Sequence, residues 1–294
     1  MSISNPFLYF RALKHCEHTV FNVADGQKYY FDPQLNRRMP YSSGQQVKRS
    51  IFTNLVDALS EQPAPITFFF EKKKKDGAIG EGEPISPCDP SYADQLLGGW
   101  MRAQSGGQQR TVKRRSPLSI SAMRPLHPLL ANMTSENLTF DRSDRPDVHK
   151  SVIKEEGEKK GQGKVLTEDE AKEAIAGTDR SLLRKWVPDN ARAYGLFVHD
   201  VAIDLRRLFA VQTSPLEPEL DEATIERLKE NGWQESQNVF GQCLICPHER
   251  REQIIKALTK SLLEWRITSN QARTYSPMET LAVSIGDHAG KITY

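Results

Sequence analysis

The hydrophobic pattern near the amino terminus predicts a strand, a helix and a second strand. Residues 7–23, FLYFRALKHCEHTVFNV, are rich in aromatic and β-branched side chains, as is typical of a long strand. The next apolar stripe has helical spacing and consists of Val47, Ile51, Leu55, Val56 and Leu59. Residues 64–71, APITFFFE, then predict a short strand.

Regular patterning returns in the last third of the chain. Residues 193–211 are mostly strand-like, and residues 220–232 predict a helix that starts with acidic residues and stops at Gly232. The stretch NVFGQCLIC leads into a helix that begins near Pro247. The apolar stripe of that helix consists of Ile254, Ile255, Leu258, Leu262 and Trp265. Residues 280–285, TLAVSI, predict a buried closing strand.

Between these two parts, from Lys72 to about Asn190, the pattern is irregular. This region holds a lysine run, clusters of glycine and proline, and the segment EEGEKKGQGKVLTEDEAKEA, so we interpret it as an insertion and not as a second compact domain. The order β-α-β, insertion, β, α, β is compatible with an α+β fold that has a ferredoxin-like core. An RNA-recognition sheet is one version of that core.

Composition narrows the function only slightly. The formal net charge of +2 is nearly neutral, so only the placement of charge can indicate a nucleic-acid partner. No stretch approaches the roughly 20 apolar residues that a membrane-spanning helix needs, and the four cysteines are too few for a disulfide scaffold. We therefore expect a soluble, cytoplasmic protein without a membrane partner.

The stretch MPYSSGQQVKRS, residues 39–50, resembles the start of a phosphate-binding helix. A nucleotide-binding P-loop is excluded, because only Gly44 is present and Lys48 stands one turn into the helix. Free backbone N–H groups at a helix start, helped by Lys48 and Arg49, can still hold a phosphate. The alternative is an ordinary capped amphipathic helix with two solvated cations.

A second basic feature lies at residues 101–124, MRAQSGGQQRTVKRRSPLSISAMR. It holds six Arg or Lys residues and no acidic residue, which favours binding to a nucleic-acid backbone. A solvated loop is the alternative.

Metal and catalytic motifs are weak. Cys243, Cys246 and His248 offer half of a zinc site, but the two cysteines fall in a probable strand, and Cys16 and Cys88 are isolated. His199 and Asp200 would point to opposite faces of a strand, so we expect a core or edge histidine. The sequence therefore predicts structural cysteines, no metal and no cofactor.

Three carboxylates cluster at residues 139–147, TFDRSDRPD. Asp141, Asp144 and Asp147 could support acid–base or metal-assisted cleavage of RNA. A polar loop with local ion pairs explains them equally simply, and no catalytic triad elsewhere supports an enzyme. We therefore predict a protein without catalytic activity.

Taken together, these blocks resemble a known family: the backbone subunit of CRISPR Cascade-type effector complexes, in the DevR-like autoregulator branch of the RAMP superfamily. The matching stretches are the first strand with MPYSSGQQVKRSI, the block DQLLGGWMRA…RTVKRRSPLSISAMRPLHPLL, and the closing SNQARTYSPMETLAVSI. They are spread from near residue 8 to 285.

The resemblance implies a modified RNA-recognition fold shaped like a hand. Residues 1–70 and 190–294 would form a discontinuous palm, and residues 71–189 an inserted finger and thumb region with a low-complexity segment at 150–180. Copies would polymerise head-to-tail along a CRISPR guide RNA, with other Cascade subunits, and present its bases for pairing with target DNA.

The resemblance also assigns RNA-binding residues. Those expected at guide phosphates near the helix start are Ser43, Gln45, Gln46, Lys48 and Arg49. Two more would lie in the basic block, Arg114 and Arg115. The closing loop would contribute Asn270, Gln271 and Arg273.

Two rival functions follow from the same residues. RNA-targeting relatives of the family cut target RNA with a thumb aspartate, a role that Asp141 or Asp144 could fill, although the best-matching blocks belong to the DNA-targeting, type I side. A DNA-binding regulator is the second rival, but the sequence shows no helix-turn-helix with a basic recognition helix.

Overall fold

The computed structural model describes most of the chain as two compact units. The described residues are 5–21, 27–72, 79–102, 111–145, 148–153, 163–178, 182–267 and 275–293. The first unit comprises residues 1–132 and 193–294, and the second comprises residues 133–192. Within the described residues, no helix is both long enough and apolar enough to cross a lipid bilayer.

The first unit is built on an antiparallel sheet. β1 (Phe7–Thr19) lies between β13 (Arg184–Asp204) and the edge strand β17 (Met278–Gly286). On its other side β13 pairs with β10 (Ala131–Asp141) and with two short strands. The short strands are β8 (Leu118–Ile120) and β9 (Arg124–Pro125).

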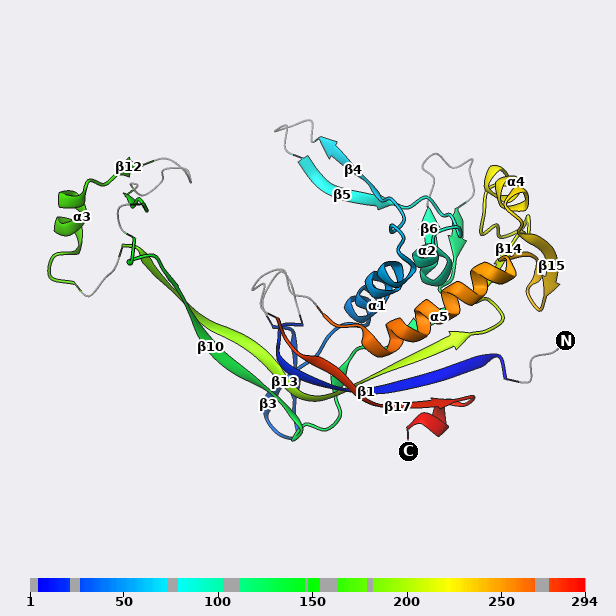
Figure 1. Ribbon diagram of the computed structural model, residues 1–294, viewed down its shortest axis with the longest axis horizontal. Coiled ribbons are helices and arrows are strands. Elements are labelled where there is room, and N and C mark those ends of the chain that lie inside the picture. The colour runs from blue at the N-terminus through cyan, green and yellow to red at the C-terminus, as the bar shows by residue number, and fades with distance from the viewer. Residues whose placement is uncertain are drawn as a thin grey trace. The chain divides into compact units, whose positions relative to one another are not determined.

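Two helices cover one face of this sheet and bury its core. α1 (Gly44–Leu59) and α5 (His248–Glu264) lie against each other on that face (Figure 1). Alternate residues of β1 point toward them, so Phe10, Ala12 and Cys16 are buried. The largest apolar side chains that are fully buried around them include Phe21, Ile51, Leu55, Phe197 and Trp265. One contiguous core therefore joins the sheet to both helices.

Smaller elements surround this core. Two hairpins are formed by β2 (Tyr29–Asp32) with β3 (Arg37–Pro40) and by β4 (Thr67–Lys72) with β5 (Ile79–Ile85). A third pairs β6 (Trp100–Arg102) with β7 (Val112–Arg114), next to α2 (Ala93–Gly98). The remaining small sheet has the order β14–β16–β15 and accompanies α4 (Glu222–Glu230). Its strands are β14 (Ala210–Gln212), β15 (Gln234–Asn238) and β16 (Gly241–Ile245), and η1 (Ala289–Ile292) ends the chain.

The second unit holds the outer parts of β10 and β13, which run side by side (Figure 1). It also contains a short hairpin, β11 (Val152–Ile153) with β12 (Lys164–Val165), and α3 (Glu168–Ile175). Thr167 and Glu170 form a reciprocal capping box at the start of α3. Residues 150–180 were predicted from the sequence to be a low-complexity segment. The part of this segment that the structure describes therefore contains regular structure.

Most predicted elements are present, with three corrections. The strand predicted at 64–71 is β4, which pairs only with β5 and does not join the central sheet. The closing strand β17 is an edge strand whose Leu281, Val283 and Ile285 are exposed, so its predicted burial is wrong. The compact unit formed by the insertion is narrower than 71–189, because residues 71–132 cluster with the first unit.

A buried ion pair explains why residues 93–116 belong to the first unit. The guanidinium of Arg114 has no exposed surface and pairs with Glu219 at 2.9 Å. It also donates to the carbonyl oxygens of Leu96, Ala210 and Arg207, at 3.3, 2.8 and 2.6 Å. Four segments of the chain therefore share one buried cation that donates four hydrogen bonds.

His199 is a core residue, as its strand parity predicted. Its side chain is fully buried, and its Nε2 accepts a hydrogen bond of 3.3 Å from Trp265 Nε1. Lys14 is buried beside it, and the Lys14 ammonium donates to Trp265 O and Thr280 Oγ1. Burial, reinforced by the charge of Lys14, lowers the pKa of His199 to about 3.

We predict that Arg114→Met lowers the free energy of unfolding by about 3–5 kcal/mol, because it removes the fully buried one of the two cations that pair with the Glu219 carboxylate and leaves only Arg207. Urea unfolding followed by circular dichroism measures the change. The matched control is Arg115→Met at the neighbouring exposed position, which should change stability by no more than about 0.5 kcal/mol. Equal effects of the two substitutions would contradict the structural role of Arg114.

We predict that His199 destabilises the fold in acid. Because its pKa is lowered in the folded state, the unfolded chain binds the proton first as the pH falls below about 6.5. Stability is then lost progressively until the pH reaches about 3. Urea unfolding of His199→Gln at pH 7, 5 and 4 should show a shallower loss than the unsubstituted chain, whereas His248→Gln, at an exposed position of α5, should follow it.

Candidate nucleic-acid interface

The start of α1 is held against the short strands at the side of the sheet. Ser42 and Met123 exchange two backbone hydrogen bonds, of 2.9 and 3.0 Å. At Gly44, a Cβ atom would lie only 2.6 Å from the carbonyl oxygen of Ile120, so glycine is required for this close approach. Gly44, which does not belong to a P-loop, is thus a packing residue that fixes where the helix begins.

The first turn of α1 is capped and carries no acidic side chain. Ser43 is the N-cap residue, and its hydroxyl accepts a hydrogen bond of 3.4 Å from the Gln46 backbone N–H. The Gln46 side chain is held by Ser42 at 3.0 Å, while Gln45 is exposed. The positive end of the helix dipole therefore meets solvent without a local carboxylate on its own helix, an arrangement that suits an anion.

Lys48 and Arg49, adjacent in sequence, have different environments. The Lys48 ammonium is half-buried and donates to Gly98 O at 2.9 Å and to Ser116 Oγ at 2.8 Å. Burial lowers the pKa of Lys48. Arg49 is exposed, and its guanidinium has no partner within the described part of the chain. Arg49 is consequently available to a phosphate, whereas Lys48 connects α1 to its neighbours.

Aromatic side chains beside this helix start were missed in the sequence. Tyr30 and Tyr41 form an edge-on pair with ring centroids 6.0 Å apart, and Lys28 lies over the Tyr41 ring. Arg38 stacks over Tyr29, with 4.6 Å from its guanidinium carbon to the ring centre. The signal was the alternation of tyrosines with cations in KYYFDPQLNRRMPY, which the β2–β3 hairpin brings into contact, Tyr30 with Tyr41 on one face and Tyr29 with Arg38 on the other. Aromatic rings interleaved with cations suit nucleic acid.

The two arginines predicted in the basic block also differ from each other in their exposure to solvent. Arg114 is buried in its pair with Glu219, so it cannot reach a phosphate in this structure, and its assignment to RNA binding is wrong. Arg115 is exposed. Arg114 is the last residue of β7 and its side chain lies in the core, whereas Arg115 follows the strand.

The predicted closing-loop residues Asn270, Gln271 and Arg273 lie outside the described residues. Of the described residues that flank them, Ile267 is buried, and Ser276 Oγ donates to the carbonyl oxygen of His18 at 3.0 Å. Ser276 therefore lies next to the carboxyl end of β1.

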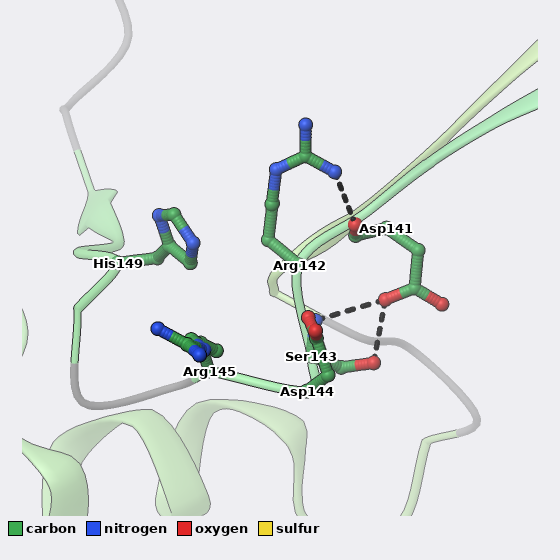
Figure 2. A pocket seen from close by; sticks show the side chains of 6 residues that line it. All are labelled: Asp141, Arg142, Ser143, Asp144, Arg145 and His149. Atoms are coloured by element: carbon green, nitrogen blue, oxygen red, sulfur yellow. Dashed lines mark hydrogen bonds between the residues drawn. The ribbon is translucent and has the colours of Figure 1, made fainter.

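The aspartates of the second unit line a small surface pocket with Arg142, Ser143, Arg145 and His149 (Figure 2). The Asp141 carboxylate accepts hydrogen bonds from the Ser143 hydroxyl and backbone N–H, at 2.5 and 2.9 Å, and pairs with Arg184. These interactions, the Ser143 hydroxyl first, lower the pKa of Asp141 to about 2.

Asp144, on the same pocket, is exposed, and no described residue pairs with its carboxylate. Both oxygens of Asp141 are engaged in holding a turn, so Asp144 is the better candidate of the two for any chemistry. Asp147 lies outside the described residues.

Metal-ligand geometry is absent from the described residues. There, no group of three His, Cys, Asp or Glu side chains is placed to share a metal ion. Cys243 and Cys246 are both buried free thiols, and burial raises the pKa of each. Cys243 lies in β16, whereas Cys246 directly follows that strand.

Comparison with solved structures identifies a shared fold. A chain of a structure described as a CRISPR RNA-guided surveillance complex, pre-nicking, superposes with a TM-score of 0.52 at 11% sequence identity, over 95% of this chain and 77% of that chain. A chain of another CRISPR RNA-guided surveillance complex gives a TM-score of 0.46 at 11% identity, over 95% and 68% of the two chains. No family model and no curated protein sequence matches this chain.

We predict that Lys48→Met destabilises the protein by about 1–3 kcal/mol, because the Gly98 carbonyl and the Ser116 hydroxyl lose a charged donor. Arg49→Met should leave stability within about 0.5 kcal/mol of the unsubstituted chain. Thermal and urea unfolding of the two variants side by side measures the difference, and a larger effect at Arg49 would refute this division of roles.

Proposed function

We propose that this chain is a guide-RNA-binding subunit of a CRISPR RNA-guided complex and that it acts without catalysis. The observation that carries the proposal is the fold shared, over 95% of the chain, with a chain of an RNA-guided surveillance complex. The sequence blocks that resemble the backbone subunit of Cascade-type complexes support the same assignment independently of the coordinates.

The topology of the first unit supports an RNA-recognition palm. The strands of its sheet lie in the order β10–β13–β1–β17. Along the chain, α1 comes after β1, and α5 comes between β13 and β17. This is the β-α-β-β-α-β connection of ferredoxin-like folds, with the second strand of the scheme supplied by the short β8, β9 and the inner end of β10. The thumb of the proposal is the second unit, residues 133–192.

The chemistry of the α1 start fits a polymer whose sequence varies. In the proposal, the exposed Arg49 and Gln45 side chains and the backbone N–H groups of the first turn hold phosphates, and phosphate contacts carry no sequence information. A subunit that carries any guide needs such contacts. In the proposal, copies assemble head-to-tail along the RNA with other complex subunits, and the held bases pair with target DNA.

A metal-dependent ribonuclease is the second candidate, supported by the exposed Asp144 carboxylate near His149 in the pocket of the second unit. The assembled complex, incubated with matched RNA and Mg²⁺, distinguishes the two. Regularly spaced cuts that disappear in Asp144→Ala would establish the ribonuclease. We expect intact RNA, and the same result with Asp141→Ala.

We predict that Arg49→Ala weakens RNA binding to a similar extent for RNAs of unrelated sequence, and that it reduces the salt slope by about one phosphate contact. Titration of labelled single-stranded RNAs at several salt concentrations measures both quantities. Lys256→Ala, a matched loss of an exposed cation on α5, serves as the control and should leave the slope unchanged. An unchanged slope in Arg49→Ala would exclude the α1 start as the phosphate site.

A further inference from the structure

The β4–β5 hairpin exposes three consecutive phenylalanines. Phe68, Phe69 and Phe70 are 57, 55 and 59% exposed, and every residue of β4 is on the surface. The hairpin pairs with no other strand among the described residues. An isolated two-stranded hairpin is marginally stable in water, and large exposed apolar surfaces mark binding sites. These rings therefore contribute little to the core and are available to a partner.

The register of the hairpin places two of the rings on one flat face. Phe68 lies opposite Pro84 and Phe70 opposite Gly82, so these four residues share a face of the ribbon. A Cβ atom at Gly82 would be 2.5 Å from the Phe70 ring, which shows that the ring lies directly on the glycine backbone. With no side chain at position 82, nothing projects beside the ring.

Charge separates the two faces of the hairpin. Phe69 lies opposite Glu83 on the other face, which therefore carries a carboxylate. In the sequence, four lysines in a row, residues 72–75, follow the aromatic strand, and Lys72, the one that the structure describes, is exposed. A polyanion with flat apolar groups would approach the Phe68 and Phe70 face and avoid the acidic one.

Nucleobases are the flat apolar groups that accompany a polyanion. Successive bases of a single strand stack on aromatic side chains, and each such contact strengthens binding in a way that tolerates any sequence. A base-paired duplex does not offer its base faces. A protein groove would accept the phenylalanines as well, but it would not account for the lysine run next to them.

We propose that Phe68 and Phe70, on the glycine-backed face of the β4–β5 hairpin, form a stacking platform for a single-stranded polynucleotide. This goes beyond the proposed function, since it concerns a second surface with a different binding chemistry from that of the α1 start. The chemistry of stacking is common to RNA and DNA, so the experiment includes both.

The test measures binding of the full chain, freed of co-purifying nucleic acid, to labelled oligo-U, oligo-dT and a DNA duplex by fluorescence anisotropy. Phe68→Ala/Phe70→Ala should weaken binding of at least one single strand about tenfold or more, with little change for the duplex. Gly82→Leu, which keeps both phenylalanines but displaces the Phe70 ring, should cause a loss in the same direction. Phe69→Ala is the matched control and should bind nearly as well as the unsubstituted chain.

Three outcomes would overturn the platform: unchanged affinity for both single strands in the double variant, an equal loss in Phe69→Ala, or a loss of the same size for the duplex. If the double variant instead lowers the sedimentation coefficient while affinity is unchanged, the hairpin is an interface between copies. Because stacking is uncharged, the double variant should keep the salt slope that Arg49→Ala reduces. Failure of the hairpin and failure of the α1 site are therefore distinguishable. Unfolding curves of all variants should coincide, since the hairpin lies outside the core.

Discussion

The buried Arg114–Glu219 pair is the interaction on which the arrangement of the first unit depends. It joins residues that are 105 positions apart in sequence and fixes the end of α2 through the Leu96 carbonyl. The adjacent Gly98 carbonyl then accepts the Lys48 ammonium, which holds α1. A cation paired inside the core is thus connected, through α2, to the start of α1. Lys48 and Arg114, two of the basic residues expected at RNA, therefore help to hold the fold together, while Arg49 is exposed on α1.

Helix and strand geometry explain this division. Successive helical residues are rotated by about 100°, so when Lys48 points toward α2, Arg49 points toward solvent. Arg114 and Arg115 also differ: Arg114 ends β7 with its side chain in the core, and Arg115 follows the strand and is exposed. Each of these two basic pairs therefore consists of one cation that holds segments of the fold together and one cation that is exposed to solvent. They are better interpreted in this way than as pairs of phosphate ligands. Net charge of +2 for the whole chain is compatible with this, because several cations are neutralised within the fold.

Local periodicity predicted what depends on local physics. The 3.6-residue stripes predicted α1 and α5, and strand parity predicted that His199 is a core or edge residue, which is buried in the structure. The pairing of strands and side chains that are far apart in the sequence could not be predicted from it. Nothing near Phe68 indicates that β4 pairs with β5 alone, and nothing near Arg114 indicates a partner at Glu219. Tyr29 and Tyr30 of β2 were missed because they meet Arg38 and Tyr41 only once the hairpin has turned.

The two candidate surfaces of the first unit have complementary chemistry. The start of α1 offers a free cation and a helix dipole, which respond to charge, and the hairpin offers aromatic rings, which respond to exposed base faces. Phosphate contacts and stacking on base faces both tolerate any base sequence. A protein that used both would discriminate a single strand from a duplex while accepting any sequence. That combination is what a carrier of variable guide sequences requires, because sequence recognition is left to base pairing.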